Sequence, residues 1–382
     1  MIMKKILYIS MSLEKSNYGG SIVSRGNLKG LKANEFLQVK DVAVVRRKEG
    51  IYGWELVAKS SKIQTALNNF FGYAGRLNKK IFNEIKRIVD EYEPNIIYLD
   101  SSMLGILAEW CKRTYPQIRV VTFFHNIEID FEVARLKSGK LQFFPSLIAT
   151  LFAEKKAAKY SDTIIMLHQA DAKRLQNLYH READFCVPVC IVDEPNVEKV
   201  TRGASITHDR PFRVGFIGSA FFANTQAAKY ISQKIAPIFI NDMDIEFIIA
   251  GNGFDGYASE LNQKNLKTYG YVESLADFYE QVDVILSPIY TGAGMKVKIA
   301  EAFKYNKKVI ASAFTLIGYE QALNNNAIDI ISCDNLDEYV AAVKKIRRTR
   351  SVPSSTRSIF EQYYSDSACA DYFKKIFLSL QS

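Results

Sequence analysis

The stretch Val214-Gly-Phe-Ile-Gly-Ser219 restarts a pattern of strand, glycine turn and helix that has already run once from the beginning of the chain. It belongs to a series of short β-branched runs, each followed by a loop and a helical pattern. These runs cover residues 212–217, 245–250, 266–269, 282–287, 308–312 and 327–332. Strands that alternate with helices are typical of parallel sheets, so the second half is predicted to form a Rossmann-like domain.

The first half shows the same alternation. Its predicted strands are residues 5–10, 38–45, 96–99, 120–124 and 163–167, and its predicted helices are residues 20–33, 79–91, 102–114 and 146–159. Between the two halves, residues 190–210 are rich in turn formers and have no periodicity, which is typical of a linker. A chain of 382 residues is also longer than one hydrophobic core usually organises, so we expect two doubly wound domains.

Composition indicates a globular chain that stays in a reducing compartment. Hydrophobic residues make up 48% and charged residues 24% of the sequence. The five cysteines are scattered and suggest neither a disulfide framework nor a zinc site. The apolar start of the chain reads as a buried strand rather than a signal peptide, and no apolar stretch reaches the ~18 residues that a membrane span needs. We therefore expect a cytoplasmic protein.

The net charge of +9 is uneven, with +8 over residues 1–200 and +1 over residues 201–382. A basic half suits anionic partners such as lipid headgroups, phosphorylated acceptors or nucleic acid, although no nucleic-acid motif accompanies the charge. An ordinary lysine-rich surface is an equal alternative. Residues 54–80, with Arg76, Lys79 and Lys80, are the better candidate for a membrane or acceptor surface. The basic and apolar stretch at residues 137–156 has the spacing either of an interfacial helix that docks on anionic lipid or of a core helix, and we predict that its apolar stripe is core.

The first predicted helix begins at paired glycines, Gly19 and Gly20. Exposed amides at such a helix start favour a phosphate or sugar oxygen, although a tight turn without a ligand explains a glycine pair equally simply. The chain lacks both the G-x-G-x-x-G fingerprint of a nicotinamide dehydrogenase and the lysine motif of a P-loop. These two classes of nucleotide-binding enzyme are therefore disfavoured.

The most informative segment for chemistry is the glycine-rich loop and helix from Ser287 to Phe303. We expect its helix to open near Met295 and to carry Lys296, Lys298 and Glu301 in its first turns. Helix-start amides with a lysine nearby suit a diphosphate, and a carboxylate further along can accept both ribose hydroxyls. The alternative is that Lys298 and Glu301 form a surface ion pair. The close spacing of Gly292 and Gly294 has no evident packing reason and favours the ligand-binding interpretation.

In these segments the chain resembles the retaining, family-4 type glycosyltransferases of the GT-B fold. The resemblance runs through Gly19-Gly20, Phe124-His125-Asn126, Ala153-Glu154, Ser161-Asp-Thr-Ile-Ile165, Gly215-Phe-Ile-Gly-Ser219 with Asn224, Ala250-Gly-Asn-Gly253, Gly270-Tyr-Val272 and the 292–301 loop and helix. Each piece is modestly specific, and their order and spacing together are strong. The resemblance implies an α/β fold with two Rossmann-like domains and an interdomain cleft.

The resemblance also implies roles for particular residues. Glu301 matches the second glutamate of the family's E-x7-E element, which holds the ribose, whereas Ala293 stands where the first glutamate would be. The family's Arg and Lys pair is missing, so Lys298, alone or with Lys296, becomes the candidate for balancing the leaving diphosphate. The donor-binding positions are Gly19, Gly20, Gly218, Ser219, Asn224, Tyr271, Val272, Gly292, Ala293, Gly294, Met295 and Lys296.

In the first half, His125 stands at the end of a predicted strand, where ligands collect in open α/β sheets. The resemblance places this histidine beside the donor sugar, with His125, Lys298 and Glu301 as catalytic residues. Glu128, three residues on, either orients an acceptor hydroxyl or caps the following helix.

The sequence therefore predicts a metal-independent glycosyltransferase of polysaccharide biosynthesis, without a cofactor, whose donor is a UDP or GDP sugar and whose product retains the anomeric configuration. We expect an acceptor-binding domain over residues 1–195, a nucleotide-sugar-binding domain over residues 205–355, and a final helix within residues 356–382 that returns to the first domain. The acceptor would be a polysaccharide or lipid-linked oligosaccharide at the inner face of the membrane. The alternatives are a nucleotide-sugar epimerase of the same fold and a catalytically impaired scaffold that binds a partner or membrane.

Overall fold

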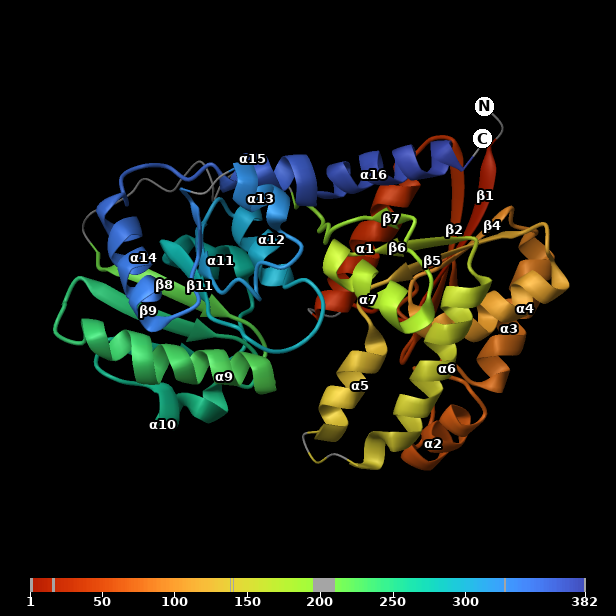
Figure 1. Cartoon of the computed structure of the whole chain (residues 1–382), viewed down its shortest axis with the longest axis horizontal. Coiled ribbons are helices and arrows are strands. Elements are labelled where there is room, and N and C mark those ends of the chain that lie inside the picture. Colours follow the sequence, from red (N-terminus) through yellow and green to blue (C-terminus); the bar gives the residue numbers. More distant parts are fainter. Residues whose placement is uncertain are drawn as a thin grey trace. The chain divides into compact units, whose positions relative to one another are not determined.

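The structure, a computed structural model, describes residues 3–15, 18–137, 139, 141–194, 210–325 and 328–380. It divides the chain into two compact units (Figure 1). Unit 1 comprises Met1–Val192 together with Asp366–Ser382, and unit 2 comprises Asp193–Ser365. Most of the predicted linker, residues 195–209, lies outside the described residues.

Unit 1 is built on a seven-stranded sheet in which all pairings are parallel, with the strand order β3-β2-β1-β4-β5-β6-β7. The strands are β1 (Lys4–Ser10), β2 (Leu37–Val45), β3 (Trp54–Val57), β4 (Ile96–Leu99), β5 (Arg119–Phe124), β6 (Thr163–Met166) and β7 (Phe185–Cys186). The helices are α1 (Gly19–Lys32), α2 (Lys62–Phe70), α3 (Lys79–Tyr92), α4 (Gly105–Thr114), α5 (Glu128–Lys137), α6 (Phe144–Tyr160), α7 (Gln169–Tyr179) and α16 (Asp366–Ser379).

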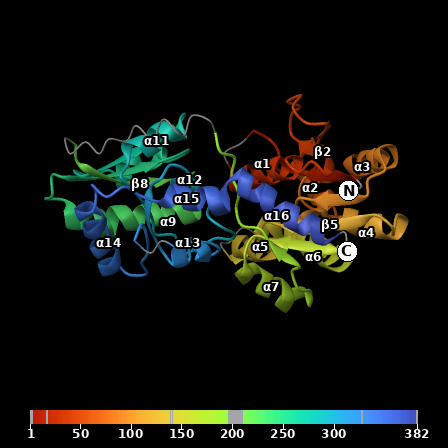
Figure 2. The ribbon, with the colours of Figure 1, turned by 90° about the horizontal axis from the view of Figure 1, so that it is seen from above.

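The last helix, α16, packs on the first helix, α1 (Figure 2). The approach is close at Gly30, where a Cβ atom would lie 2.8 Å from the sulfur of Cys369. At one end of the contact, the Lys29 ammonium lies 2.5 Å from the Asp366 carboxylate. The C-terminal helix therefore belongs to the packed body of unit 1, far in sequence from its partner.

Unit 2 has a six-stranded parallel sheet in the order β10-β9-β8-β11-β12-β13. The strands are β8 (Phe212–Ile217), β9 (Ile245–Ala250), β10 (Leu266–Tyr269), β11 (Val284–Ser287), β12 (Lys308–Ala311) and β13 (Ile330–Ser332). The helices are α9 (Phe222–Tyr230), α10 (Ala258–Leu261), α11 (Leu275–Gln281), α12 (Val297–Lys304), α13 (Glu320–Asn325), α14 (Leu336–Arg348) and α15 (Thr356–Ile359).

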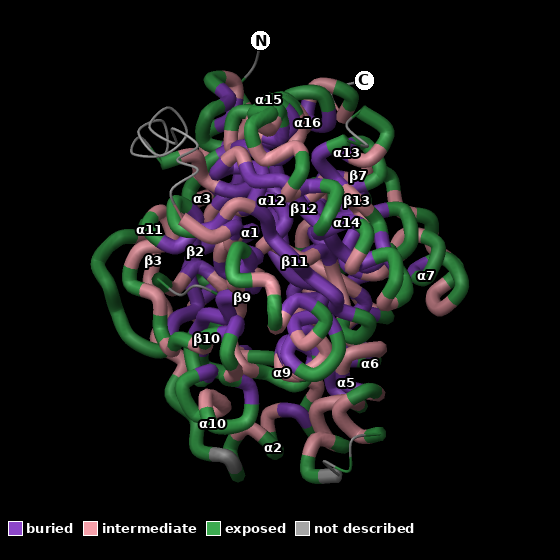
Figure 3. The backbone as a smooth tube through the Cα atoms, turned by 90° about the vertical axis from the view of Figure 1, so that its left-hand side faces the viewer, coloured by how far each residue is buried: buried purple, intermediate pink, exposed green. Residues whose placement is uncertain are grey.

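The central strands of both sheets are buried on both faces, as Figure 3 shows in purple. In β4, β11 and β12 every residue is buried, which explains why these segments read as continuous runs rather than alternating patterns. The predicted strands at 96–99, 212–217, 245–250 and 266–269 are confirmed to the residue. Helix α12 begins at Val297, two residues later than predicted, so Lys296 precedes the helix.

One further expectation is corrected by the structure. The apolar stripe predicted to be core is exposed at Phe144, Ile148, Leu151 and Phe152, because α6 buries mainly alanines and Glu154 instead. Lys140, in the same stretch, lies outside the described residues. Among the described residues, no helix is long and apolar enough to cross a bilayer.

Each sheet contains one point where the strand order reverses. In unit 1 the reversal lies between β1 and β4, and in unit 2 between β8 and β11. In open parallel sheets the loops after such strands diverge and leave a crevice at the carboxyl edge, which is where ligands bind. The topology therefore directs attention to the loops that follow Ser10, Leu99, Ile217 and Ser287.

Candidate functional site

In unit 2, the reversal point brings together the loop after β8 and the start of α12. The Lys298 ammonium donates a hydrogen bond to Oδ1 of Asn224 over 2.9 Å, and the Asn224 amide nitrogen donates to the carbonyl oxygen of Ser219 over 2.7 Å. A Cβ atom at Gly218 would lie 2.6 Å from the Asn224 amide nitrogen and 2.9 Å from the Lys298 nitrogen. Glycine at 218 is therefore required for this cluster to form.

The surroundings of Lys298 stabilise the charge of its ammonium only in part. Its ammonium lies 4.2 Å from the centre of the Phe216 ring. Burial lowers the pKa of Lys298 to about 7, against the attraction of Glu301. Among the described residues its ammonium bonds to an amide and is in no carboxylate ion pair, so the predicted alternative of a surface ion pair with Glu301 is wrong. A buried amine of this kind becomes fully charged when an anion approaches.

The glycine-rich loop before α12 is stabilised from within. Gly292 and Gly294 have φ angles of +113° and +63°, a region that glycine adopts without strain. The backbone turn itself therefore gives a reason for the two glycines that is independent of a ligand. The Lys296 ammonium donates to the carbonyl oxygens of Ala293 and Gly294 at 3.2 and 2.6 Å. Lys296 therefore shapes the loop, and Lys298 is the better placed cation for a ligand.

The loop is also tied to the unit behind it. The buried side chain of Met295 fills the space beside Gly318, where a Cβ atom would lie 2.6 Å from it. The Tyr319 hydroxyl donates to the carbonyl oxygen of Lys296 over 3.0 Å. Met295 is thus a packing residue that fixes the approach to α12.

Glu301 lies one turn after Lys298 on α12 and is half-buried. Burial raises its pKa, while Lys304, Lys298 and a hydrogen bond from Tyr279 act in the opposite direction. The Tyr279 hydroxyl lies 3.4 Å from the carbonyl oxygen of Lys298 and so links the backbone of this turn to the carboxylate. A half-buried carboxylate held by a tyrosine can accept hydroxyl groups from a ligand such as ribose.

Two predicted donor residues lie apart from this cluster. Tyr271 and Val272 follow β10, the edge strand, and Tyr271 is 66% exposed. No contact joins them to Lys298 or Asn224 among the described residues. Unit 2 by itself does not bring Tyr271 and Val272 to the reversal point, and their role in donor binding stays a prediction.

In unit 1, His125 follows β5 and contacts the residue that follows β4. Its Nε2 lies 3.3 Å from Oδ1 of Asp100 and 3.1 Å from the Asp100 carbonyl oxygen. Asp100 is itself held by the Ser10 hydroxyl over 2.8 Å, at the end of β1. Burial opposes the charge on His125, but Asp100 and Glu128 raise its pKa overall. His125 Nδ1 is buried and has no hydrogen-bond partner among the described residues.

Glu128 is the first residue of α5 but does not cap that helix. The backbone amides of Glu128 and Ile129 instead donate to the buried carboxylate of Glu154, at 2.8 and 3.2 Å. Burial and the repulsion from Glu154 raise the pKa of Glu128 to about 7, although His125 lowers it. The capping alternative is therefore wrong, and Glu128 is a carboxyl group that can exchange a proton near neutrality.

The remaining predicted residues of unit 1 differ in environment. Gly19 and Gly20 form the first turn of α1, and a Cβ atom at Gly20 would meet nothing within 4 Å. Arg76 pairs with Glu14 over 2.9 Å and also donates to a backbone carbonyl oxygen, so it supports the fold rather than a free surface. Lys79 and Lys80 are exposed in the first turn of α3.

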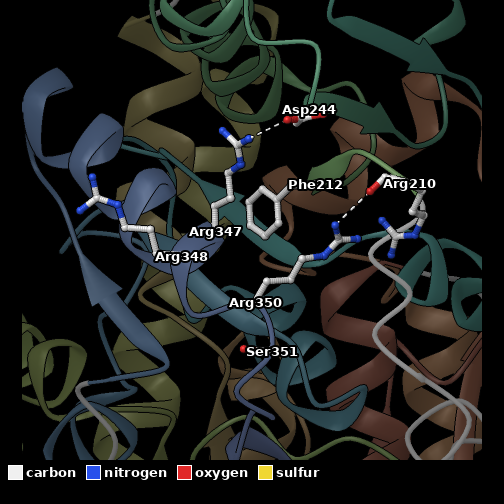
Figure 4. Close-up of a pocket in the computed structure, with 7 residues that line it drawn as sticks. All are labelled: Arg210, Phe212, Asp244, Arg347, Arg348, Arg350 and Ser351. Carbon is white, nitrogen blue, oxygen red and sulfur yellow. Dashed lines mark hydrogen bonds and ion pairs between the residues drawn. The ribbon is translucent and has the colours of Figure 1, made fainter.

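The pocket drawn in Figure 4 does not coincide with these clusters. It lies beside Phe212 and Asp244, at the amino ends of β8 and β9 and thus at the sheet edge opposite the reversal-point loops. Arg347 pairs with Asp244, while Arg210 and Arg350 both pair with Asp283. Three of its four arginines, Arg210, Arg347 and Arg350, form ion pairs within unit 2, so we do not assign the pocket to a ligand.

Sequence reasoning missed several residues that shape these clusters, namely Asp100, Glu154, Tyr279 and Phe216. Asp100 had a signal, because it directly follows a short buried strand at a reversal point. Among the described residues, no group of three or more His, Cys, Asp or Glu side chains could hold a metal ion.

Comparisons with known proteins point to one class of enzyme. Residues 211–348 match the family of glycosyl transferases group 1. A relative, an uncharacterized 44.6 kDa protein in the cps region of Klebsiella pneumoniae, is 27% identical over 178 residues. These residues are 42% of this chain and 45% of the relative, so the match spans less than half of the relative's length.

Among solved structures, Anabaena HepE in complex with UDP-glucose has a TM-score of 0.65 at 12% identity and covers 98% of this chain and 100% of its own. A trehalose-6-phosphate synthase studied for glycosyl transfer with retention has a TM-score of 0.64 at 11% identity, with 98% and 99% coverage. At these identities the likeness concerns the fold. It confirms the predicted α/β architecture of GT-B type, and the family match confirms the glycosyltransferase resemblance.

Proposed function

We propose that this chain is an enzyme that moves a sugar from a nucleotide-sugar donor to a saccharide or lipid-linked acceptor. The match of residues 211–348 to glycosyl transferases group 1 and the GT-B fold support this proposal. The observation that carries the proposal is the Lys298 ammonium, which lies half-buried at the reversal point of unit 2 without a carboxylate partner among the described residues. A diphosphate supplies the negative charge that this position lacks.

In the proposed reaction, the bond between the anomeric carbon and the diphosphate oxygen breaks, and a bond to an acceptor hydroxyl oxygen forms. Negative charge grows on the diphosphate, where Lys298 stabilises it. Glu301 accepts the ribose hydroxyls of the donor. A base accepts the hydroxyl proton of the acceptor. The candidate in unit 1 is Glu128, whose pKa burial raises to about 7, and His125 beside it has a pKa that Asp100 and Glu128 raise.

The nucleobase of the sugar donor should be sought first among uridine nucleotides. The solved structures with the same fold include one in complex with UDP-glucose and one described as a co-structure of MnaA with UDP. The relative from the cps region supports an acceptor in surface polysaccharide synthesis. Retention of configuration is supported by the resemblance to retaining enzymes.

We further propose that the transfer needs no metal ion. Lys298 and the loop amides before α12 provide the positive charge that a cation supplies in other transferases. Glu301, the acidic residue of this cluster, is bound by Tyr279 rather than grouped with other carboxylates.

The test is to incubate the protein with UDP, GDP and ADP sugars, with and without an acidic polysaccharide or lipid-linked acceptor, and to identify the products. Release of a nucleoside diphosphate that is accelerated by an acceptor supports transfer. Conversion of the donor to its epimer without an acceptor would establish the epimerase alternative. Binding of a nucleotide without turnover would indicate the impaired scaffold.

A further inference from the structure

Helix α2 turns its apolar face towards solvent. Ile63, Leu67, Phe70 and Phe71 recur at the spacing of one helix face, and Phe70 is 83% exposed. On the opposite side, the polar Asn69 is buried. A surface helix of a soluble domain normally does the reverse, with its apolar stripe on the core.

Helix α6 repeats this inversion with identical spacing. Its exposed apolar residues are Phe144, Ile148, Leu151 and Phe152. The residues that it buries are small or polar and include Ala149, Ala153 and Glu154.

Helix α2 packs on α6, and Ala74, which follows α2, packs on Ala149 and Ala153 of α6 (Figure 1). The eight exposed apolar residues of the two neighbouring helices are termed the α2–α6 face. Side chains of this size, gathered on one side of a domain, mark a surface that binds an apolar partner.

The charges around the α2–α6 face are of one sign. Residues 56–83 contain five basic residues and no acidic residue. Within residues 133–161 the sole acidic residue is Glu154, which is fully buried, whereas Lys155 and Lys159 are exposed on the helix turns that follow Phe152. The face therefore combines large apolar side chains with a basic surround.

This combination distinguishes between the two simplest occupants of the face. In a twofold contact between two copies of the chain, the same patch meets itself, so the basic surrounds would face one another and repel. An anionic bilayer offers both an apolar phase for the phenylalanines and negative headgroups for the lysines.

We propose that the α2–α6 face is a lipid-docking surface that lies in the plane of an anionic bilayer. Phe70, Phe71, Phe144 and Phe152 enter the boundary between headgroups and acyl chains, while Lys155 and Lys159 contact the headgroups. Both helices keep their positions on unit 1, because the residues that hold them together are not those that enter the lipid. This proposal does not depend on the sugar transfer proposed above.

The test is co-sedimentation of the full chain with phosphatidylcholine vesicles that contain or lack phosphatidylglycerol. The apolar variant is I63S/L67S/F70S, and its control is I238S/M243S/V352S, which removes three exposed apolar side chains from unit 2. The charge variant is K155Q/K159Q. Circular dichroism and thermal unfolding verify that each variant is folded.

We expect the wild type and the control, whose three replaced side chains are each at least half exposed, to bind the anionic vesicles. The apolar variant should bind at least about tenfold more weakly, since each lost side chain removes apolar burial, and the charge variant should lose much of the preference for anionic lipid. Raising the salt concentration should weaken wild-type binding. Equal binding of the apolar variant and its control, absence of vesicle binding by the wild type, or a dimer that only the apolar variant abolishes would overturn the proposal.

Discussion

Replacing Lys298 by Met should stabilise the unliganded protein and weaken its binding of a nucleoside diphosphate. Burial of the ammonium lowers the pKa of Lys298 to about 7. The charged form is therefore disfavoured in the folded protein by up to about 4–5 kcal/mol relative to the unfolded chain. Solvent that reaches the half-buried side chain screens part of this cost, and loss of the bond to Asn224 removes about 1 kcal/mol more.

The net stabilisation by K298M is thus about 1–2 kcal/mol at pH 7, or roughly 3–6 °C in Tm for a unit of this size. The sign of its pH dependence is fixed by the lowered pKa. The unfavourable contribution of Lys298 is complete below about pH 7 and disappears as the pH approaches the unfolded value near 10.4. Met has no such titration, so the difference in Tm between the variant and the wild type should shrink steadily above neutrality.

Binding should change in the opposite direction. Loss of a charged hydrogen bond to phosphate costs about 1.5–3 kcal/mol, which is roughly a 10- to 100-fold rise in the Kd of UDP, measured by isothermal titration calorimetry. Wild-type affinity should fall as the pH rises above 7, because the neutral amine of Lys298 must then gain a proton before it can bind the diphosphate. The affinity of K298M should be nearly independent of pH in this range.

Lys307 provides a matched control. It is buried at the amino end of β12, on the sheet edge opposite the reversal point, and burial lowers its pKa to about 8. Lys307→Met should therefore stabilise the protein in a similar way while leaving the Kd of UDP unchanged. An unchanged Kd for K298M, or equal losses of affinity in both variants, would refute the role of Lys298 at the diphosphate.

Three further predictions concern Glu301, the pair of Asp100 and His125, and the metal dependence of turnover. Glu301→Gln should weaken donor binding by about 1.5–3 kcal/mol, visible in the Kd of a nucleotide but not in that of inorganic diphosphate, which has no ribose. Asp100→Asn should lower the pKa of His125, and because a raised His pKa stabilises the fold below that pKa, its loss of Tm should be larger at about pH 5 than at about pH 9. Donor turnover should persist in EDTA, and activity that returns only with manganese would contradict the metal-independent mechanism.

The central strands of unit 2 could be predicted because they are buried on both faces and therefore appear in the sequence as continuous apolar runs. Strand β3 was missed because it is a four-residue edge strand in which every residue is half-buried, so it lacks the pattern of a strand packed on a core. Helix α2 does carry apolar residues at helical spacing, but its segment was interpreted only as a basic and aromatic surface.

The site residues could be predicted where reactive side chains lie close together in the sequence. Lys298 and Glu301 were found because both follow a strand and a glycine-rich loop on one short helix. The bond between Lys298 and Asn224 joins residues 74 positions apart and depends on how two strands pair, which spacing does not reveal. Burial of Lys298, and hence its lowered pKa, likewise arises only when Phe216 and α12 come together.

The central claim is that this chain uses a nucleotide-sugar donor held through Lys298. Its most direct test is donor turnover by the wild type, K298M and K307M with a panel of UDP, GDP and ADP sugars, followed as nucleoside diphosphate released in the presence of acceptor. The account predicts that one donor is consumed by the wild type and K307M, and that K298M loses at least about tenfold in kcat. Equal turnover by all three proteins, or no turnover of any donor, would contradict it.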